Sequence, residues 1–130
     1  MAETRCDVHT LIGDIVVLAD SAVLLVKDAA EDRGWRLPGG PLRHGEHPEA
    51  AARRLLKEQT GVEPEYVELM EVESVPGANW HLYFHFRTDL DRRPEPGPMI
   101  GDLRLFQLEH LPATQHGTWE RDVIYRVVSK

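Results

Sequence analysis

The stretch GPLRHGEHPEAAARRLLKEQTGV, residues 40–62, decides the fold of this chain. Its first part is a polar loop, and its second part has the composition of a helix. Pro48 suits the first turn of a helix, because the N–H that proline lacks would have no helical partner there. Three alanines follow, which favour a helix, and Gly61 is a natural terminator. The stretch therefore predicts a helix over residues 48–60.

This stretch resembles the signature of the Nudix hydrolases, G-x5-E-x7-R-E-U-x-E-E-x-G-U, where U is a bulky aliphatic residue. The matching positions are Gly40, Glu46, Arg54, Leu56, Glu58, Gly61 and Val62. Two acidic positions of the signature hold other residues, Leu55 and Gln59. WRLPGG at 35–40 and FQLEHLP at 106–112 resemble the segments that accompany the signature. The resemblance implies one Nudix-like domain over residues 1–130, with an α+β fold in which a mixed sheet lies inside an α/β/α sandwich.

The resemblance also implies a reaction, the hydrolysis of a nucleoside diphosphate linked to another group, with Mg²⁺ or Mn²⁺. A diphosphate repels a nucleophilic water unless cations neutralise its charge and bind the water. Hard divalent cations need oxygen ligands, and acids at i, i+3 and i+4 share one helix face. Here these three positions are Leu55, Glu58 and Gln59, so only Glu58 supplies a charge.

From the resemblance we expect four residues with catalytic roles, namely Glu58, Gln59, Glu46 and Arg54. Glu46 and Arg54 are expected to form an ion pair that holds the loop against the helix. Glu58 is the surviving carboxylate ligand, whereas Gln59 could offer only a neutral carbonyl oxygen. Leu55 is expected to pack as an apolar residue beside the site.

The expected metal ligands are Glu58, Gly40 and Asp102. Glu109 is an alternative to Asp102 as a compensating acid, and two loop histidines, His44 and His47, could supply nitrogen ligands. Each of these has a simpler interpretation as a solvent-exposed polar residue. Arginines at 36, 43 and 53 are candidates for phosphate contacts, and tryptophans at 35 and 80 are candidates for stacking on a base.

Three functions stay open at this point. The first is a Nudix-type hydrolase with weakened or altered metal catalysis, since the loss of one positioned acid or base typically costs ~10²–10⁴-fold in rate. The second is a catalytically inactive Nudix domain that binds a nucleotide or phosphorylated metabolite. The third is a changed chemistry of a bound diphosphate on the same scaffold. The replacements at Leu55 and Gln59 weaken the first function and permit the others. We nevertheless rank the hydrolase first, because Arg54, the glycines of the signature and Glu58 are retained.

The composition restricts the partners. With 42% hydrophobic and 28% charged residues among 130, the chain has the make-up of a globular domain. A net charge of −7 disfavours a nucleic acid polymer or a membrane surface. The resemblance implies a small phosphorylated metabolite or nucleotide as the partner. A single cysteine, Cys6, excludes a disulfide framework and fits a reducing cytoplasm. We also expect a homodimer, the commonest assembly of soluble proteins.

The rest of the chain alternates between strand and helix patterns. Strands are predicted at residues 8–18, 22–27, 66–75, 80–87 and 103–108, with a short extended piece at 35–37. A proline-rich loop is predicted at 89–101, and a last helix is predicted after Thr118. This interleaving independently favours a mixed α+β domain with a sheet between helices.

Overall fold

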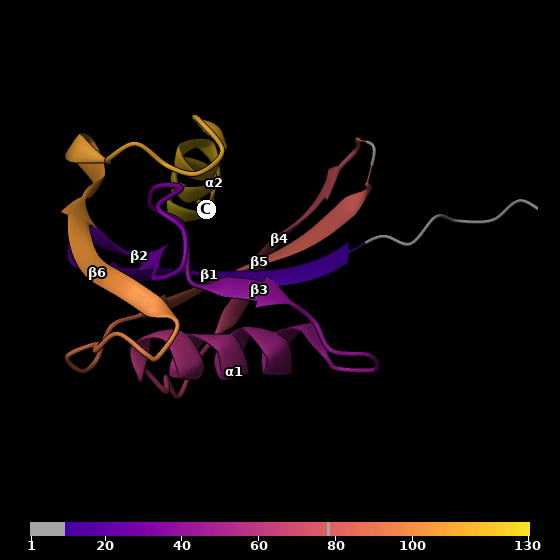
Figure 1. Ribbon diagram of the computed structural model, residues 1–130, viewed down its shortest axis with the longest axis horizontal. Helices are drawn as coiled ribbons and strands as arrows, with labels where there is room; N and C mark the ends of the chain where they lie inside the picture. Colours follow the sequence, from indigo (N-terminus) through magenta and orange to yellow (C-terminus); the bar gives the residue numbers. More distant parts are fainter. Residues whose placement is uncertain (1–9, 78) are drawn as a thin grey trace, which may run out of the picture.

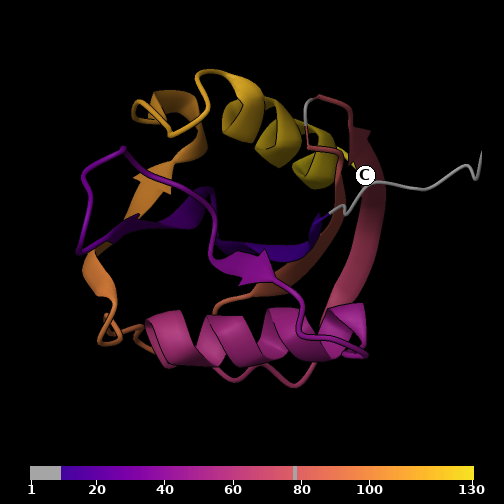
Figure 2. The same ribbon diagram turned by 45° about the vertical axis from the view of Figure 1, so that its right-hand side comes forward.

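A six-stranded sheet lies between two helices in the computed structural model, which describes residues 10–77 and 79–130 (Figure 1). The strands are β1 (Thr10–Ala19), β2 (Ala22–Asp28), β3 (Gly39–Pro41), β4 (Glu68–Val75), β5 (His81–Asp89) and β6 (Ile100–Gln107). The helices are α1 (Pro48–Thr60), the short 3-10 helix η1 (Leu108–His110) and α2 (Trp119–Val128). Helices α1 and α2 cover opposite faces of the sheet (Figure 2). The expected α/β/α sandwich is therefore confirmed.

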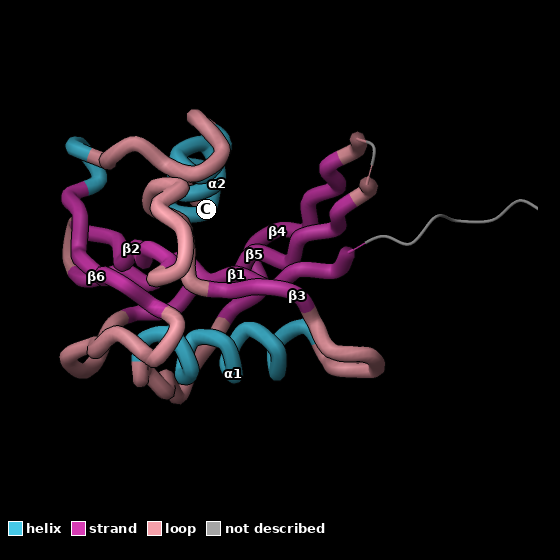
Figure 3. The backbone as a smooth tube through the Cα atoms, viewed as in Figure 1, coloured by secondary structure: helices cyan, strands magenta, loops and turns pink. Residues whose placement is uncertain are grey.

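Strand β1 organises the sheet, whose order is β4-β5-β1-β2-β6. One edge of β1 pairs in parallel with β5 from Thr10 to Leu18. The other edge is divided, because its first half pairs with β3 and its last two residues begin the hairpin with β2. Strand β3 thus lies beside β1 and above α1 in Figure 3. The sheet is mixed, as expected.

Alternate residues of β1 face opposite helices, because side chains in a strand point to alternating sides. Ile15 and Val17 belong to the core on the α1 side, whereas Val16 and Leu18 belong to the core on the α2 side. All four side chains are buried. The continuous apolar run of this strand therefore reflects burial on both faces.

The helix predicted over residues 48–60 is confirmed at both ends. His47 is its N-cap, and the Nδ1 atom of His47 accepts a hydrogen bond from the backbone N–H of Glu49 at 3.1 Å. Gly61 ends the helix in a left-handed conformation, with φ of 74°. None of the described helices is long and apolar enough to cross a membrane.

Several strand boundaries differ from the prediction. The fourth strand begins at Glu68 rather than at residue 66, and the predicted loop at 89–101 is shorter, because β5 continues to Asp89 and β6 begins at Ile100. The two glycines after Pro38 form part of β3, where we had expected only the end of an extended piece. Residues 8 and 9 of the first predicted strand, and Cys6, lie outside the described residues.

The loop between β5 and β6 is fastened to the C-terminal end of α1. The backbone N–H of Glu95 donates to the carbonyl oxygen of Thr60 at 2.9 Å, and that of Gly97 donates to the carbonyl oxygen of Gln59 at 3.0 Å. A Cβ atom at position 97 would overlap the carbonyl oxygen of Glu58. These contacts satisfy carbonyl groups that a helix end leaves without helical partners.

Candidate functional site

The loop before α1 is held to the helix by the expected ion pair between Glu46 and Arg54. Arg54 Nε and Nη2 each donate to Glu46 at 2.9 Å, in the two-bond arrangement that suits a guanidinium and a carboxylate. The backbone N–H of Arg43 also donates to Glu46, at 2.9 Å. The hydrogen bonds from Arg54, followed by the one from Arg43, lower the pKa of Glu46 to about 2. Glu46 is therefore an ionised, structural carboxylate.

Glu58 lies on the solvent side of α1, with 53% of its side chain exposed. Its nearest charged neighbours are cations: Arg54 Nη1 lies 3.5 Å from one carboxylate oxygen, and Arg43 Nη2 lies 4.0 Å from the other. The charge of Glu58 is thus already shared between two guanidinium groups.

Gln59 joins α1 to β3 through both atoms of its amide. Its Nε2 donates to the carbonyl oxygen of Gly39 at 2.9 Å, and its Oε1 accepts from the backbone N–H of Gly39 at 3.0 Å. Gly39 has a φ of 147°, and a side chain there would collide with Gly13 and Asp14, so the position requires glycine. The amide of Gln59 therefore matches the donor and the acceptor of one residue in β3.

Arg36 completes this joint. Its Nη1 donates to Gln59 Oε1 and to the carbonyl oxygen of Gly39, both at 3.3 Å. The guanidinium is itself held by Asp28, with contacts of 2.7 and 3.0 Å, and these hydrogen bonds from Arg36 are the main cause of the lowered pKa of Asp28. Arg36, a candidate for a phosphate contact, is thus engaged within the protein.

Leu55 is buried and packs against β3. An added Cβ atom at Gly40 would lie 3.5 Å from Leu55 Cδ1. Gly40 itself stands opposite Gly13 in the pairing of β3 with β1. Leu55 therefore fills the space beside Gly40 with an apolar side chain, as the sequence led us to expect.

The other candidate metal ligands lie in separate places. Asp102, in β6, forms an ion pair with Arg104 at 3.3 Å, and Glu109 lies in η1. His44 is exposed in the loop before α1, where His47 caps the helix. No group of three acidic, histidine or cysteine side chains within ligand distance, among the residues described, includes Glu58 or Asp102.

The residues present do not fit a Mg²⁺ or Mn²⁺ centre of the signature type. Glu58 is the single carboxylate on the relevant part of α1, and it is paired with two arginines. The oxygen atoms of Gln59 and Gly39 already accept hydrogen bonds from within the protein, and Leu55 has none to offer. Hard divalent cations prefer several oxygen ligands with negative charge.

A cavity of about 360 Å³ lies on the α2 side of the sheet, between β3 and the start of α2. Its lining is mostly apolar and includes Leu55 and Gln59 of α1. The remaining lining residues are Ile12, Asp14, Arg36, Leu37, Gly39, Gly40, Pro41, Tyr83, His116, Trp119 and Glu120. This size and this mixture of apolar and polar groups suit a small-molecule site.

Two buried carboxylates that line the cavity were not among the site residues predicted from the sequence. They are Asp14 and Glu120, which are 5% and 2% exposed. Both oxygens of Glu120 are bonded to His116, one to its backbone N–H and one to its Nδ1. The available signal for Asp14 was a lone acid inside the apolar run of β1. For Glu120 the helical pattern gave no signal, because this residue lies in a polar first turn.

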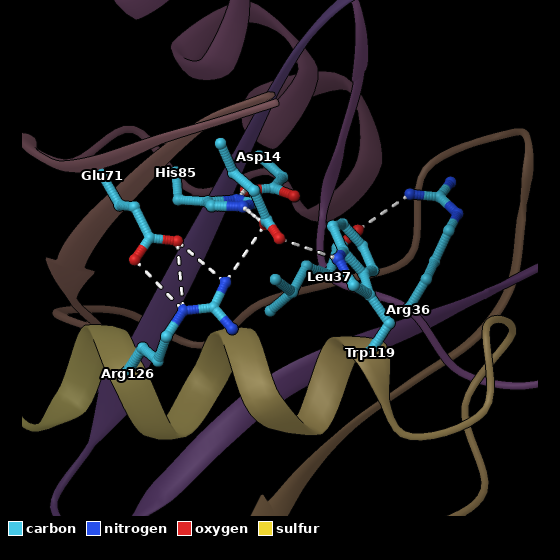
Figure 4. Close-up of polar contacts among 8 residues, drawn as sticks. Asp14, Arg36, Leu37, Glu71, His85, Trp119 and Arg126 are labelled. Atoms are coloured by element: carbon cyan, nitrogen blue, oxygen red, sulfur yellow. Dashed lines mark hydrogen bonds and ion pairs between the residues drawn. The ribbon is translucent and has the colours of Figure 1, made fainter. Parts of the chain in front are cut away.

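Asp14 belongs to a chain of polar groups that leads from the cavity to the surface. Asp14 Oδ1 lies 2.5 Å from His85 Nδ1, and His85 Nε2 lies 2.8 Å from Glu73 Oε1. Glu73 in turn accepts from Trp119 Nε1 at 3.2 Å and from Arg126 at 3.1 Å. Figure 4 shows Asp14 and His85 together above α2, with Arg126 reaching up from the helix.

The burial of these groups shifts their pKa values. Burial raises the pKa of Asp14, and the hydrogen bond to His85 opposes this rise only in part. Burial lowers the pKa of His85, but its hydrogen bonds and charge interactions with Asp14 and Glu73 outweigh burial and raise it above its usual value. Arg126 bonds Glu71 at 2.8 Å, and this bond is the main cause of the lowered pKa of Glu71.

Glu71, Glu73 and His85 place their ligand atoms within 4.8 Å of one another. This arrangement is nevertheless unsuited to a metal ion. The guanidinium of Arg126 already bonds both carboxylates, and His85 uses both ring nitrogens on acids.

Aromatic rings surround the polar end of the cavity. Tyr83 stacks on His85 with ring centres 5.5 Å apart, and Trp119 lies 4.7 Å from Tyr83. The tryptophans proposed from the sequence for stacking are placed differently: Trp35 is buried against Phe106, and Trp80 is not part of the cavity lining.

The sequence matches the NUDIX domain over residues 9–127, and the chain therefore belongs to this family. An RNA pyrophosphohydrolase of Xanthomonas campestris is 32% identical over 97 residues, which are 75% of this chain and 44% of that protein. The chain spans 30 to 44% of the length of curated relatives that it matches.

Solved structures share the fold at lower identity. A MutT NUDIX hydrolase from Burkholderia pseudomallei has a TM-score of 0.80 at 21% identity, covering 93% of this chain and 99% of its own. The NUDIX domain of Shewanella oneidensis NrtR, complexed with ADP ribose, has a TM-score of 0.79 at 20% identity, covering 95% of this chain and 89% of its own. At these identities the likeness shows the α+β Nudix fold alone.

Proposed function

We propose that this chain is a Nudix domain that binds a nucleotide in the cavity beside β3, with little or no hydrolysis through the signature helix. One observation carries the proposal. Positions 55 and 59, where the signature has acids that could bind a metal, instead hold side chains that connect α1 to β3. Both polar atoms of the Gln59 amide are hydrogen-bonded to Gly39, and Leu55 packs beside Gly40. A neutral, occupied amide and a leucine cannot replace two carboxylates.

The loss of metal catalysis does not imply the loss of binding. The cavity has the size and the aromatic lining of a small-molecule site, and it borders the signature helix directly. The Nudix domain of NrtR, which has the same fold, is complexed with ADP ribose. A nucleotide or another small phosphorylated metabolite is therefore the proposed ligand.

Weakened hydrolysis is the second candidate, and the retained signature residues favour it. The pair of Glu46 with Arg54 still holds the loop, and Glu58 still faces solvent at the expected turn of α1. Nudix chemistry typically uses a divalent metal, and a relative is named as an RNA pyrophosphohydrolase. A single exposed carboxylate would bind Mg²⁺ or Mn²⁺ weakly.

The test compares the wild type with the double variant Leu55→Glu/Gln59→Glu. Product release from nucleoside triphosphates, dinucleoside polyphosphates and nucleotide sugars would be measured with Mg²⁺ or Mn²⁺, and binding of the same compounds by calorimetry. Lys57→Glu is the matched control, because it changes the charge of exposed α1 by the same two units without adding an acid at positions 55 or 59.

We expect binding without product release by the wild type, and a gain of metal-dependent release by the double variant. Product release by the wild type at ordinary enzyme rates would contradict the proposal and favour a hydrolase. The absence of binding to every nucleotide would also contradict it.

A further inference from the structure

One oxygen of Asp14 has no hydrogen-bond partner among the residues that the structure describes. Asp14 Oδ1 is bonded to His85, but Oδ2 makes no hydrogen bond with any residue that the structure describes. The residue is 5% exposed and lines the cavity. A buried acceptor without a partner is costly, because it has lost water and gained nothing in exchange. Such an atom indicates a ligand that donates a hydrogen bond.

His85 is the positioning residue that keeps Asp14 an acceptor. Its two ring nitrogens each face a carboxylate oxygen. When both carboxylates are ionised, both ring nitrogens donate, and the ring is positively charged. The imidazolium lies between Asp14 and Glu73 and offsets one of their two negative charges, and Arg126 bonds Glu73 as well. Because it is completely buried, it holds Asp14 in one orientation.

The rest of this cavity end excludes a phosphate group. Asp14 and Glu120 both line it. Burial is the main cause of the raised pKa of Asp14, and the charges of Glu73 and Glu120 add to it. Arg36, a cation in the lining, is already bound to Asp28. An anionic group would be repelled here, so the phosphates of a bound nucleotide must point away from Asp14.

The neighbouring side chains favour a flat, aromatic ligand group. Tyr83 and Trp119 line the cavity with their ring centres 4.7 Å apart, and Leu55 adds apolar surface. Aromatic rings and nucleobases pack well face to face or face to edge. The site thus combines aromatic walls with a carboxylate acceptor.

We propose that Asp14 recognises a nucleobase whose edge carries an N–H beside an amino group, which is the edge of guanine. Two parallel hydrogen bonds from such a pair need both oxygens of the carboxylate. Oδ2 accepts one of them, and Oδ1 accepts the other with the lone pair that its bond to His85 leaves over. Hypoxanthine has the same ring N–H but lacks the amino group, and uracil has one ring N–H. This inference rests on the proposed function, because it identifies which nucleotide the cavity takes and which end of it enters.

The experiment measures the binding of guanosine, inosine, GDP and IDP by calorimetry. The nucleosides test the base site without phosphates, and the diphosphates test the whole ligand. For the wild type we expect guanosine to bind about 10- to 100-fold more tightly than inosine, the range of one charge-assisted hydrogen bond. We expect a similar ratio for GDP over IDP.

The variant Asp14→Asn should reduce the preference for guanosine to within about threefold, because its amide turns one acceptor into a donor. Asp91→Asn, which changes an exposed aspartate, is the matched control and should keep the preference. If Asp14→Asn does not fold, the comparison of guanosine with inosine on the wild type still decides the question.

Equal binding of guanosine and inosine would overturn the inference. Binding of GDP and IDP with equal strength would overturn it while leaving the proposed nucleotide-binding function intact. Guanosine binding without any binding of the diphosphates would support the base site and contradict the proposed function. The absence of any binding would overturn both.

Discussion

Replacing His85 by leucine should destabilise the protein strongly. His85 is fully buried and is bonded to Asp14 at 2.5 Å and to Glu73 at 2.8 Å. Leucine would leave the carboxylate of Asp14 buried without its cation, which typically costs about 3–5 kcal/mol. In a domain of ordinary stability, about 5–15 kcal/mol in total, this is a large fraction.

Urea denaturation at pH 7 would measure the loss. The matched control is His81→Leu, the same substitution on the same strand at a half-buried histidine, and it should change the free energy of unfolding by less than about 1 kcal/mol. The double variant Asp14→Leu/His85→Leu should lose less than the single variant, because it removes the unpaired charge as well. A loss below about 1 kcal/mol for His85→Leu would refute this account. So would a double variant whose loss of stability equals the sum of the losses for Asp14→Leu and His85→Leu.

The same network predicts a pH dependence. The folded pKa of His85 lies above its usual value of 6.5, so its stabilisation is complete below pH 6.5 and is lost as the pH rises through the folded pKa. The raised pKa of Asp14 acts in the same direction, because its buried carboxylate costs stability only when ionised. Wild-type stability should therefore fall as the pH rises above about 6.5, and the double variant should lack this part of the decline.

Three further outcomes follow from the structure. Glu58→Ala should change the free energy of unfolding by less than about 0.5 kcal/mol and remove any Mg²⁺-dependent product release; a large destabilisation would give Glu58 a structural role. Gly97→Ala should destabilise by about 2 kcal/mol or more in thermal unfolding, because its Cβ would overlap α1. Gly77→Ala should not, because a Cβ there would make only an ordinary contact with the carbonyl oxygen of Asn79 at 3.9 Å. In the wild type, the ionised carboxylate of Glu46 stabilises the fold above pH 4.5, and this stabilisation is lost as the pH falls to about 2. Glu46→Gln should lack this part of the decline in the free energy of unfolding, measured by denaturation at several pH values in that range.

Local signals in the sequence were enough for α1 and its charged loop. Pro48 begins the helix and Gly61 caps its end, so both boundaries are set by local residues. Glu46 and Arg54, which form the ion pair, are only eight residues apart. The signature resemblance supplied the sandwich and the mixed sheet. The catalytic and metal-binding roles assigned to Glu58, Gln59 and Asp102 stay predictions.

The cavity depends on pairings that no local pattern contains. Asp14 and His85 are 71 residues apart and meet because β1 pairs in parallel with β5. The hydrogen bonds between Gln59 and Gly39 likewise depend on the pairing of β3 with β1, which brings Gly39 to the helix. Hydrophobic periodicity reports which face of an element is buried, but not which polar groups meet across the sheet.

The amide of Gln59 also bears on how the domain responds to its ionic surroundings. Where several carboxylates converge on one point, mutual repulsion makes the folded state depend on the cations that neutralise them. Here a neutral side chain closes the junction with two hydrogen bonds of 2.9 and 3.0 Å. The thermal transition should then be the same in excess chelator as in millimolar Mg²⁺. The stability of such a domain would then depend on the concentration of its ligand and not on the concentration of divalent ions.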